Sequence, residues 1–368
     1  MTAQGPGIGD LDGMVEALPE KSRKMLQQIL QITTVQGEIR PPDSMLPWIV
    51  KQFGSTEGVI RQKVIKVTNL VTCEGAIFNP VRALRPRRLE DRLTVEARLI
   101  DDARSDPLNH PFQDTPEDLF GRIQSKHCVT ASNVAKYDGF HGMIIFDHHN
   151  PLGFTRDMVL DYLETGWQWA QKAHEYDPSA RYYFFLWNCL QRAGATLAHG
   201  HCQVVLGRGQ HYAKIDSLRR AALRYRAEYG SDYFSDLFRV HADLGLAFEK
   251  EGTRVISYLT PIKEKEVVIL APALNASLKD RVHDVLACFR DDMQVTAFNL
   301  GLATPPLAAT PEDWTGFPVV VRLVDRGYPS DGSSDFGTME LFAASVISSD
   351  PFNVARCLKD RLDGRGRP

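Results

Sequence analysis

The sequence of 368 residues lacks the features by which membrane, secreted and nucleic-acid-binding proteins are usually recognised. No stretch approaches the roughly 20 consecutive apolar residues of a transmembrane helix, so we expect no membrane association. The first residues have neither the basic start nor the apolar run of a signal peptide. The net charge of −3 gives no electrostatic reason to expect binding to nucleic acid or to an anionic membrane.

Paired cysteines with metal-binding or redox spacing are also missing. The six cysteines are scattered, with no Cys-x-x-Cys pair: Cys73, Cys128, Cys189, Cys202, Cys288 and Cys357. Free thiols in a reducing compartment explain this simply, and we expect a cytoplasmic protein. The chain is 43% hydrophobic and 24% charged, which is typical of a globular protein, and its length allows two domains.

Three polar side chains interrupt an apolar stretch near the middle of the chain. His199, His201 and Gln203 alternate in sequence, so a β-strand through Leu206 places all three on one face. An apolar strand carries three polar groups on one face only when they have partners, and two imidazoles with an amide suit attack on phosphorus. Small residues at 193–195 allow a ligand to approach the preceding backbone closely.

Together with Asn188, thirteen residues before the second histidine, these residues resemble a family motif. The motif is Asn-x4-Ala-Gly-Ala-Ser-x-x-His-x-His-x-Gln, from the transferase branch of the histidine-triad (HIT) superfamily. This branch contains galactose-1-phosphate uridylyltransferases and diadenosine tetraphosphate phosphorylases, also called ATP adenylyltransferases. Thr196 replaces the serine and keeps its hydroxyl.

The resemblance implies a role for each motif residue. His201 would attack the α-phosphorus of a nucleotide and carry the nucleotidyl group, which gives ping-pong kinetics. A neutral imidazole is available for this near pH 7. Gln203 would donate to a phosphate oxygen, and His199 completes the catalytic set. The remaining motif residues would hold the same phosphates: Asn188, Gly194 and Thr196.

The amide of Gln203 also favours transfer over hydrolysis. Hydrolytic members of the superfamily have a third histidine there, which can move a proton, whereas an amide cannot. A phosphate acceptor is already ionised and needs no general base, whereas water does. The sequence therefore predicts transfer to a phosphorylated acceptor.

Two segments before the motif resemble other parts of these proteins. Residues 70–86 resemble the uridylyltransferase opening, which implies that Arg82 and Arg85 contact the nucleotide phosphates. A solvated basic run is the alternative, because two more arginines follow directly. Residues 109–136 resemble the phosphorylases, which implies that Asn133 contacts the base or ribose.

A third segment lies near the end of the chain. Residues 335–342 resemble the uridylyltransferase segment that recognises hexose hydroxyls, which implies that Glu340 binds the acceptor. A helix cap is the alternative role for this glutamate.

Zinc is bound in several uridylyltransferases by Cys-x-x-Cys, a downstream histidine and the first histidine of the motif. Here the cysteine pair is missing, and residues 109–112 stand roughly in its place. We therefore expect that no cofactor is required. The alternative is zinc held by His148, His149 and His199, since three imidazoles can bind this ion.

The resemblance implies an α+β fold of tandem HIT-like modules, each an antiparallel sheet packed with helices. We expect a helical N-terminal extension at 1–60, a catalytic module at 61–240 and a degenerate second module at 241–368. In the extension, apolar residues recur at helical spacing from Met25 to Ile32, and Pro41-Pro42 ends the pattern. In the second module the His-rich strand of the family is replaced by residues 317–324.

The leading hypothesis for function is a hexose-1-phosphate uridylyltransferase-like enzyme of the nucleotidyltransferase class. It would use a nucleotide or nucleotide-sugar donor and a phosphorylated small-molecule acceptor. The alternatives are a dinucleoside polyphosphate phosphorylase or ATP adenylyltransferase, a nucleotide-binding sensor without catalysis, and a histidine-based metal protein. The sequence leaves the nucleobase, the acceptor and a homodimer open.

Overall fold

The computed structural model describes residues 5–84, 94–95, 106–329 and 336–365. A nine-stranded sheet runs through the molecule in the order β4-β5-β7-β6-β11-β12-β10-β9-β8, and its neighbouring strands are antiparallel. In this order, the strands are β4 (Cys128–Ser132), β5 (Phe140–Phe146), β7 (His201–Arg208), β6 (Ala180–Cys189), β11 (Phe298–Ala303), β12 (Val319–Asp325), β10 (Glu264–Ala271), β9 (Thr253–Ser257) and β8 (Ala247–Lys250).

The two halves of the chain share this sheet. Strands β6 and β11 pair at its centre, with Asn188 opposite Asn299 and Leu186 opposite Gly301. Outward from this pair, the first half adds β7, β5 and β4, while the second half adds β12, β10 and β9. The tandem modules therefore form one continuous sheet with a symmetrical strand order.

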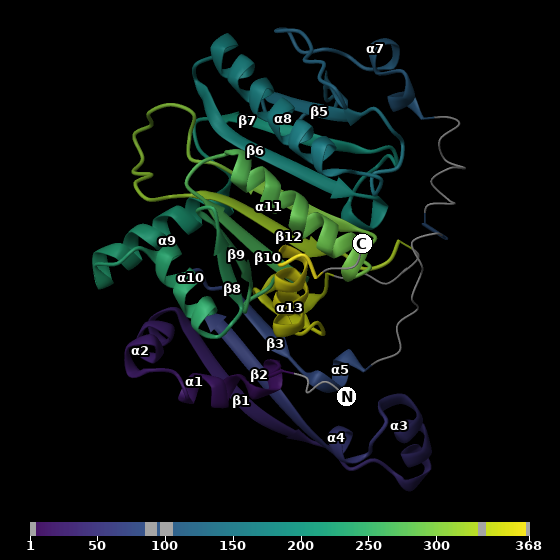
Figure 1. Cartoon of the computed structure of the whole chain (residues 1–368), viewed down its shortest axis with the longest axis vertical. Helices are drawn as coiled ribbons and strands as arrows, with labels where there is room; N and C mark the ends of the chain where they lie inside the picture. The colour runs from purple at the N-terminus through teal and green to yellow at the C-terminus, as the bar shows by residue number, and fades with distance from the viewer. Residues whose placement is uncertain (1–4, 85–93, 96–105, 330–335, 366–368) are drawn as a thin grey trace.

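Helices cover one face of this sheet (Figure 1). They are α8 (Arg156–Tyr176) over the first half, α11 (Ala276–Ala287), which continues as a π-helical turn at 288–292, and α13 (Pro351–Leu362). Tyr162 and Trp169 of α8 are buried against the sheet, as expected for packing residues. A side chain at Gly142 of β5 would overlap the Trp169 ring, so the glycine allows α8 to lie close.

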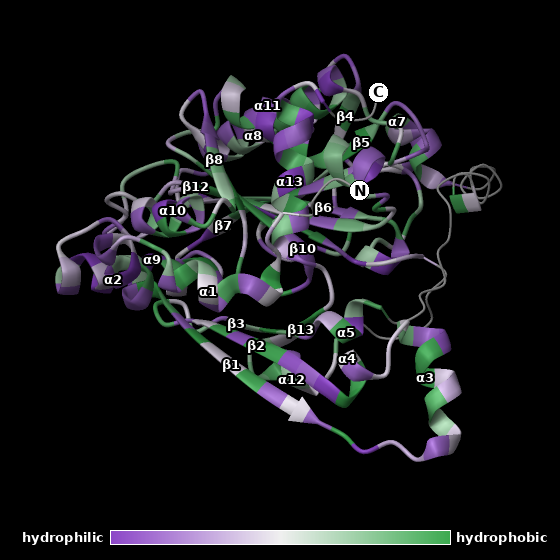
Figure 2. Ribbon diagram, turned by 60° about the horizontal axis from the view of Figure 1, so that its bottom comes forward, coloured by the Kyte–Doolittle hydropathy of each residue, from purple (hydrophilic) through white to green (hydrophobic). Residues whose placement is uncertain are grey.

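A second, four-stranded sheet lies across the other face, against the second half (Figure 2). Its order is β1-β2-β3-β13, with β13 parallel to β3 and the other pairs antiparallel. Its strands are β1 (Leu30–Glu38), β2 (Arg61–Asn69), β3 (Gly75–Phe78) and β13 (Ala344–Ile347). Helices α9 (Ala213–Tyr229) and α10 (Tyr233–Asp243) pack into the same hydrophobic cluster. The four-stranded sheet and these two helices cover the second half of this face of the large sheet, so the first half of the same face can hold a site.

Short helices complete the described chain. They are 3₁₀ turns at Ile8–Asp10, Asp43–Met45, Pro107–Asn109 and Gln191–Ala193, and α-helices α1 (Leu11–Glu16), α2 (Glu20–Ile29), α3 (Leu46–Phe53), α4 (Glu57–Ile60), α5 (Pro80–Ala83), α7 (Pro111–Asp114) and α12 (Thr338–Leu341). Among the described helices, none combines the length and apolar character needed to cross a lipid bilayer.

The predicted α+β class, with sheets packed against helices, is confirmed. The prediction of a wholly helical N-terminal extension is wrong in one place. The helical pattern ends with α2 at Ile29, and residues 30–38 form β1, which pairs along its whole length with β2. The β-branched run Ile32-Thr-Thr-Val35 favours a strand, and pairing with β2 outweighs the helical spacing.

Candidate active site

Strand β7 carries the predicted catalytic residues in the first half of the large sheet. His201 pairs with Ile145 of β5, and Gln203 lies between Met143 of β5 and Leu186 of β6. Cys202 and Val204 point into the core beneath α8, so His201 and Gln203 face the opposite side. Both are buried, at 7% and 9% exposure. The predicted alternation on one face is therefore observed for His201 and Gln203, whereas His199 lies in the bend before β7 rather than on the strand.

The surroundings of His201 fix its tautomer. Its Nδ1 lies 2.8 Å from the carbonyl oxygen of His199, which can only accept a hydrogen bond. Nδ1 therefore carries the proton, and Nε2 keeps its lone pair. Burial lowers the pKa of His201 below its usual value, which favours the neutral ring. The imidazole is thus prepared to act as a nucleophile through Nε2.

The amide of Gln203 is oriented by His141, a buried residue of β5. The Tyr137 backbone N–H donates to His141 Nδ1 at 3.0 Å, so the proton of this ring lies on Nε2. His141 Nε2 donates to Gln203 Oε1 at 2.7 Å. Burial lowers the pKa of His141 and keeps the ring neutral. Because Gln203 Oε1 already accepts a hydrogen bond from His141, the amide N–H groups of Gln203 are left as donors.

Asn188 of β6 is oriented in the same way from the second half of the chain. Asn299 of β11 donates through Nδ2 to the Ala193 carbonyl oxygen and to Asn188 Oδ1, both at 2.7 Å. Arg326 donates to Asn299 Oδ1, which fixes the direction of that amide. The oxygen of Asn188 is therefore occupied, and its N–H groups are left as donors.

The loop between β6 and β7 carries the other predicted phosphate contacts. Gly194 adopts a left-handed backbone with φ of 97°, which favours glycine. Gly194 and Thr196 are exposed. Asn133 follows β4, and its backbone N–H donates to the His141 carbonyl oxygen at 2.8 Å, which places it beside the residue that orients Gln203.

Two predicted residues lie elsewhere in the chain. Arg82 belongs to α5, which lies to the right of β3, beside the four-stranded sheet and away from β7 in Figure 1. Glu340 belongs to α12, where its carboxylate accepts from the Gly337 N–H at 2.8 Å and lies 3.7 Å from Lys263 Nζ. The alternative role of Glu340 as a helix cap is thus observed. Arg85 lies outside the described residues.

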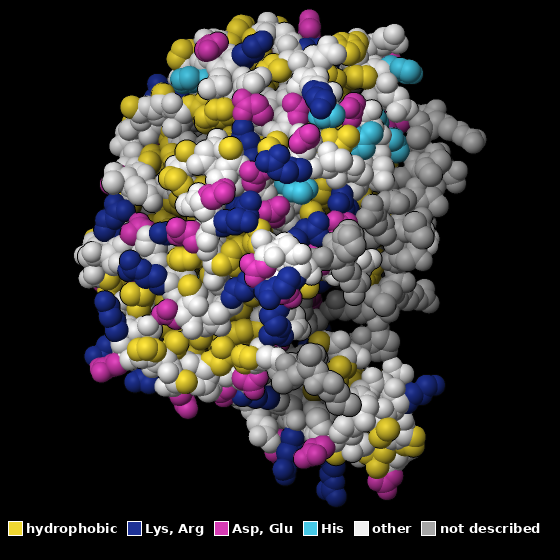
Figure 3. All heavy atoms as spheres, viewed as in Figure 1, with side chains coloured by type: hydrophobic (Ala, Val, Ile, Leu, Met, Phe, Trp, Pro, Cys, Tyr) yellow, Lys and Arg dark blue, Asp and Glu magenta, His cyan; other side chains and the backbone are white. Residues whose placement is uncertain are grey.

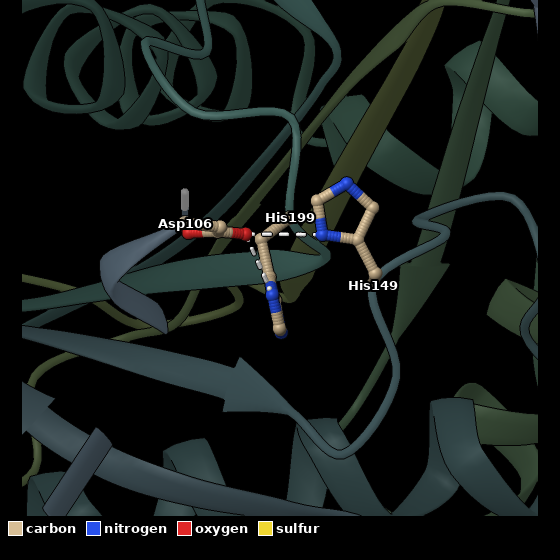
Figure 4. A group of neighbouring side chains, drawn as sticks. All are labelled: Asp106, His149 and His199. Atoms are coloured by element: carbon tan, nitrogen blue, oxygen red, sulfur yellow. Dashed lines mark ion pairs between the residues drawn. The ribbon is translucent and has the colours of Figure 1, made fainter. Parts of the chain in front are cut away.

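The buried His199 lies in a cluster with Asp106 and His149, which are half-buried (Figure 4). Asp106 Oδ2 lies 2.8 Å from His199 Nδ1 and 3.0 Å from His149 Nδ1. Histidine side chains gather at the upper right of the face shown in Figure 3. His148, predicted as the third ligand, instead contacts Asp147 at 3.0 Å. Asp106 is the third member of the cluster in place of His148, because the loop before α7 brings Asp106 to the start of β7.

The chemistry of this cluster fits a cation. His199 Nε2 lies 3.1 Å from the Phe146 carbonyl oxygen, so the proton lies there and Nδ1 presents a lone pair to Asp106. Burial lowers the pKa of His199, which favours this neutral form. Among the described residues, Asp106 Oδ2, His199 Nδ1 and both ring nitrogens of His149 make no hydrogen bond. Two acceptors in contact are stabilised by a shared proton or metal ion, and zinc accepts such nitrogen and oxygen ligands.

Three residues of the site were missed by the sequence analysis. Asp106 precedes Pro107 in an unpatterned loop, and no sequence signal links it to the histidines. His141 and Asn299 are polar residues within apolar strands, which is a recognisable signal of a partnered side chain.

Comparisons with known proteins identify the fold. The structure resembles ADP-glucose phosphorylase from Arabidopsis thaliana with bound ADP-glucose, with a TM-score of 0.56 and 17% identity over 79% of this chain and 96% of that chain. It resembles a GalT-like protein from the same plant, with a TM-score of 0.53 and 16% identity over 70% and 98% of the two chains. A uridylyltransferase gives a TM-score of 0.56 and 13% identity over 82% and 99%.

The sequence itself matches no family model and no curated protein. The structural similarity shows that the chain has the fold of uridylyltransferases and nucleotide-sugar phosphorylases. At 13–17% identity, this similarity shows the fold alone, and it agrees with the predicted α+β arrangement of sheets and helices.

Proposed function

We propose that the protein transfers a nucleoside monophosphate from a nucleotide donor to a phosphorylated acceptor through a covalent bond to His201. The observation that supports this is the arrangement of one neutral imidazole with a free Nε2 beside two amides whose oxygens are already held. Such preorganised donors stabilise charge that develops on a phosphoryl group. The similarity in fold to a uridylyltransferase and a phosphorylase supports the same class of reaction.

The reaction has two displacements. In the first, His201 Nε2 attacks the α-phosphorus, a P–N bond forms, and the bond to the bridging oxygen breaks to release the phosphorylated leaving group. In the second, a phosphate oxygen of the acceptor attacks the same phosphorus and the P–N bond breaks. Gln203 and Asn188 donate to the non-bridging oxygens in both steps. The acceptor enters as an anion, so Gln203 need not accept a proton.

For the substrates, we propose a nucleotide sugar as donor and a hexose 1-phosphate as acceptor. The sequence resemblance of residues 70–86 and 335–342 to uridylyltransferase segments favours this choice. Arg82 and Glu340 themselves lie away from β7 (Figure 1 and Figure 2), so their positions do not support it. Inorganic phosphate as acceptor is the second candidate. It is favoured by the structural similarity to a phosphorylase that holds ADP-glucose.

We also propose that zinc binds Asp106, His149 and His199. Bound there, the ion would supply charge that holds the His199 ring against Asp106. The His199 carbonyl oxygen accepts a hydrogen bond from His201 Nδ1–H, so this cluster would orient the nucleophile without taking part in either displacement.

Intact-protein mass spectrometry tests the mechanism. The purified protein is incubated separately with UDP-glucose, UDP-galactose, ADP-glucose, ATP and diadenosine tetraphosphate. A gain of one UMP or one AMP identifies the donor, and the His201→Gly variant should show no gain. Tight binding of a nucleotide with no adduct from any donor would favour the sensor alternative.

A further inference from the structure

The second half of the large sheet contains a position that corresponds to that of Gln203 in the candidate active site. Arg322 of β12 lies between Val268 of β10 and Gly301 of β11, as Gln203 of β7 lies between its two neighbours in the first half. Two residues earlier, Val320 corresponds to His201. This position therefore has no nucleophile.

The polar contacts of the two positions correspond as well. Gln203 bonds His141, two residues before its partner Met143 on the outer strand. Arg322 donates through Nε to Glu266, two residues before its partner Val268 on the outer strand. The same pair of positions is thus used in both halves, with different side chains.

A cavity of about 370 Å³ lies over this counterpart position. Gly301 and Ala303 form part of its floor, and their small size leaves the face of the sheet hollow. Its walls are mainly apolar and aromatic, with Phe184 of β6, Leu218 of α9 and Phe317 before β12. The volume lies within the range of about 300 to 1,000 Å³ that is usual for small-molecule pockets.

One end of the cavity is polar and electrically balanced. Arg322 Nη1 donates to Glu74 at 2.6 Å, and Lys214 Nζ lies 3.3 Å from the same carboxylate. Glu266 is the second carboxylate, so two cations face two acidic groups. Arg322 Nη2 is buried and has no hydrogen-bond partner among the described residues. At this end of the cavity one buried donor, Arg322 Nη2, is therefore unpaired within the described part of the chain, and there is no excess of positive charge.

We propose that this cavity binds an uncharged, largely apolar small molecule whose single oxygen accepts a hydrogen bond from Arg322 Nη2. The apolar walls favour a hydrocarbon or aromatic body over a hexose, whose hydroxyl groups would lose water without gaining partners. The balanced charges favour a hydroxyl or carbonyl oxygen over a carboxylate or phosphate. With Val320 in the place of the nucleophile, the ligand is bound without chemical change.

Calorimetric titration of the full chain with 1-hexanol, 1-octanol and 1-decanol tests this proposal. Each buried methylene contributes about 0.8 kcal/mol, so the affinity should rise about fourfold per methylene while the cavity has room. Decanoate should bind more weakly than 1-decanol. The series needs no nucleotide, so its result is independent of transfer through His201.

Substitutions in the cavity locate the binding. Ala303→Phe fills the floor and should abolish alcohol binding, whereas Ala309→Phe, at an exposed position after β11, should leave it unchanged. Leu218→Trp on α9 fills the cavity from the other side and serves if the first variant does not fold. The proposal is overturned if no alcohol binds, if binding survives in a folded cavity-filling variant, or if decanoate binds more tightly than 1-decanol.

Discussion

Replacing His141 by Phe tests whether the orientation of Gln203 matters for catalysis. The substitution removes the N–H that holds Gln203 Oε1 at 2.7 Å and keeps a ring of similar shape in the buried position. The amide then has no partner that selects one of its two orientations. We expect a slower formation of the nucleotidyl adduct with little change in donor affinity.

The magnitude follows from the burial of the hydrogen bond. A buried acceptor that loses its donor is destabilised by about 1 to 3 kcal/mol. If the whole penalty falls on the transition state, adduct formation slows roughly 5- to 150-fold. His141→Gln, which restores an N–H donor, should recover part of the rate.

A double-mutant cycle in single-turnover adduct assays separates orientation from a general structural effect. If His141 acts only through Gln203, His141→Phe should cause no further loss in a Gln203→Ala background. His110→Phe, at an exposed histidine, controls for the change of ring chemistry. Losses that add in the double variant would refute the reasoning, as would an unchanged rate in His141→Phe alone.

Further predictions concern the nucleophile, the pH dependence and the metal. His201→Gly should abolish the adduct but retain nucleotide binding, and full turnover in this variant would exclude the mechanism. Gln203→Ala should slow transfer by roughly one to three orders of magnitude in the same adduct assay. Because burial lowers the pKa of His201, the rate of adduct formation should stay level from pH 8 to about 6.5 and fall only at lower pH; a decline that begins above pH 7 would contradict this. Burial lowers the pKa of His211 and His241 to about 4. Each neutral ring therefore contributes about 3 kcal/mol to the free energy of unfolding above pH 6.5, and this contribution is lost as the pH falls toward 4. Chemical denaturation across that range measures this loss, and a constant stability would argue against neutral buried histidines. Asp106→Asn should reduce the zinc content measured by plasma mass spectrometry, and a wild-type protein whose melting temperature does not respond to zinc would rule out the metal site.

The predictions that the structure confirms depend on patterns among residues that are neighbours in the sequence. The alternation of His201 and Gln203 in an apolar run identifies a strand with a polar face, because side-chain direction in a strand is set by neighbouring residues alone. In α8 (Arg156–Tyr176) the buried residues likewise recur at helical spacing, which is a local pattern of the same kind. Both features depend on residues that are close in sequence.

The predictions that failed or were missing depend on distant partners. β1 forms because Leu30–Glu38 pairs with β2, which the helical spacing of residues 25–32 does not reveal. Asp106 meets His199 although 92 residues separate them in the sequence, and Asn299 reaches Asn188 from the other half of the chain. Such contacts depend on how the sheet assembles rather than on a motif.

The pairing of β6 with β11 has a consequence for how this chain can change. The half without the histidine motif supplies β11, which covers the inner edge of the half that contains the motif, together with the Asn299 amide that donates to Asn188 Oδ1. A chain shortened to its catalytic half would expose β6 as an unpaired edge, which is prone to aggregation. The second half is therefore needed although it lacks the histidine motif, because the candidate site takes residues from both halves where β6 meets β11.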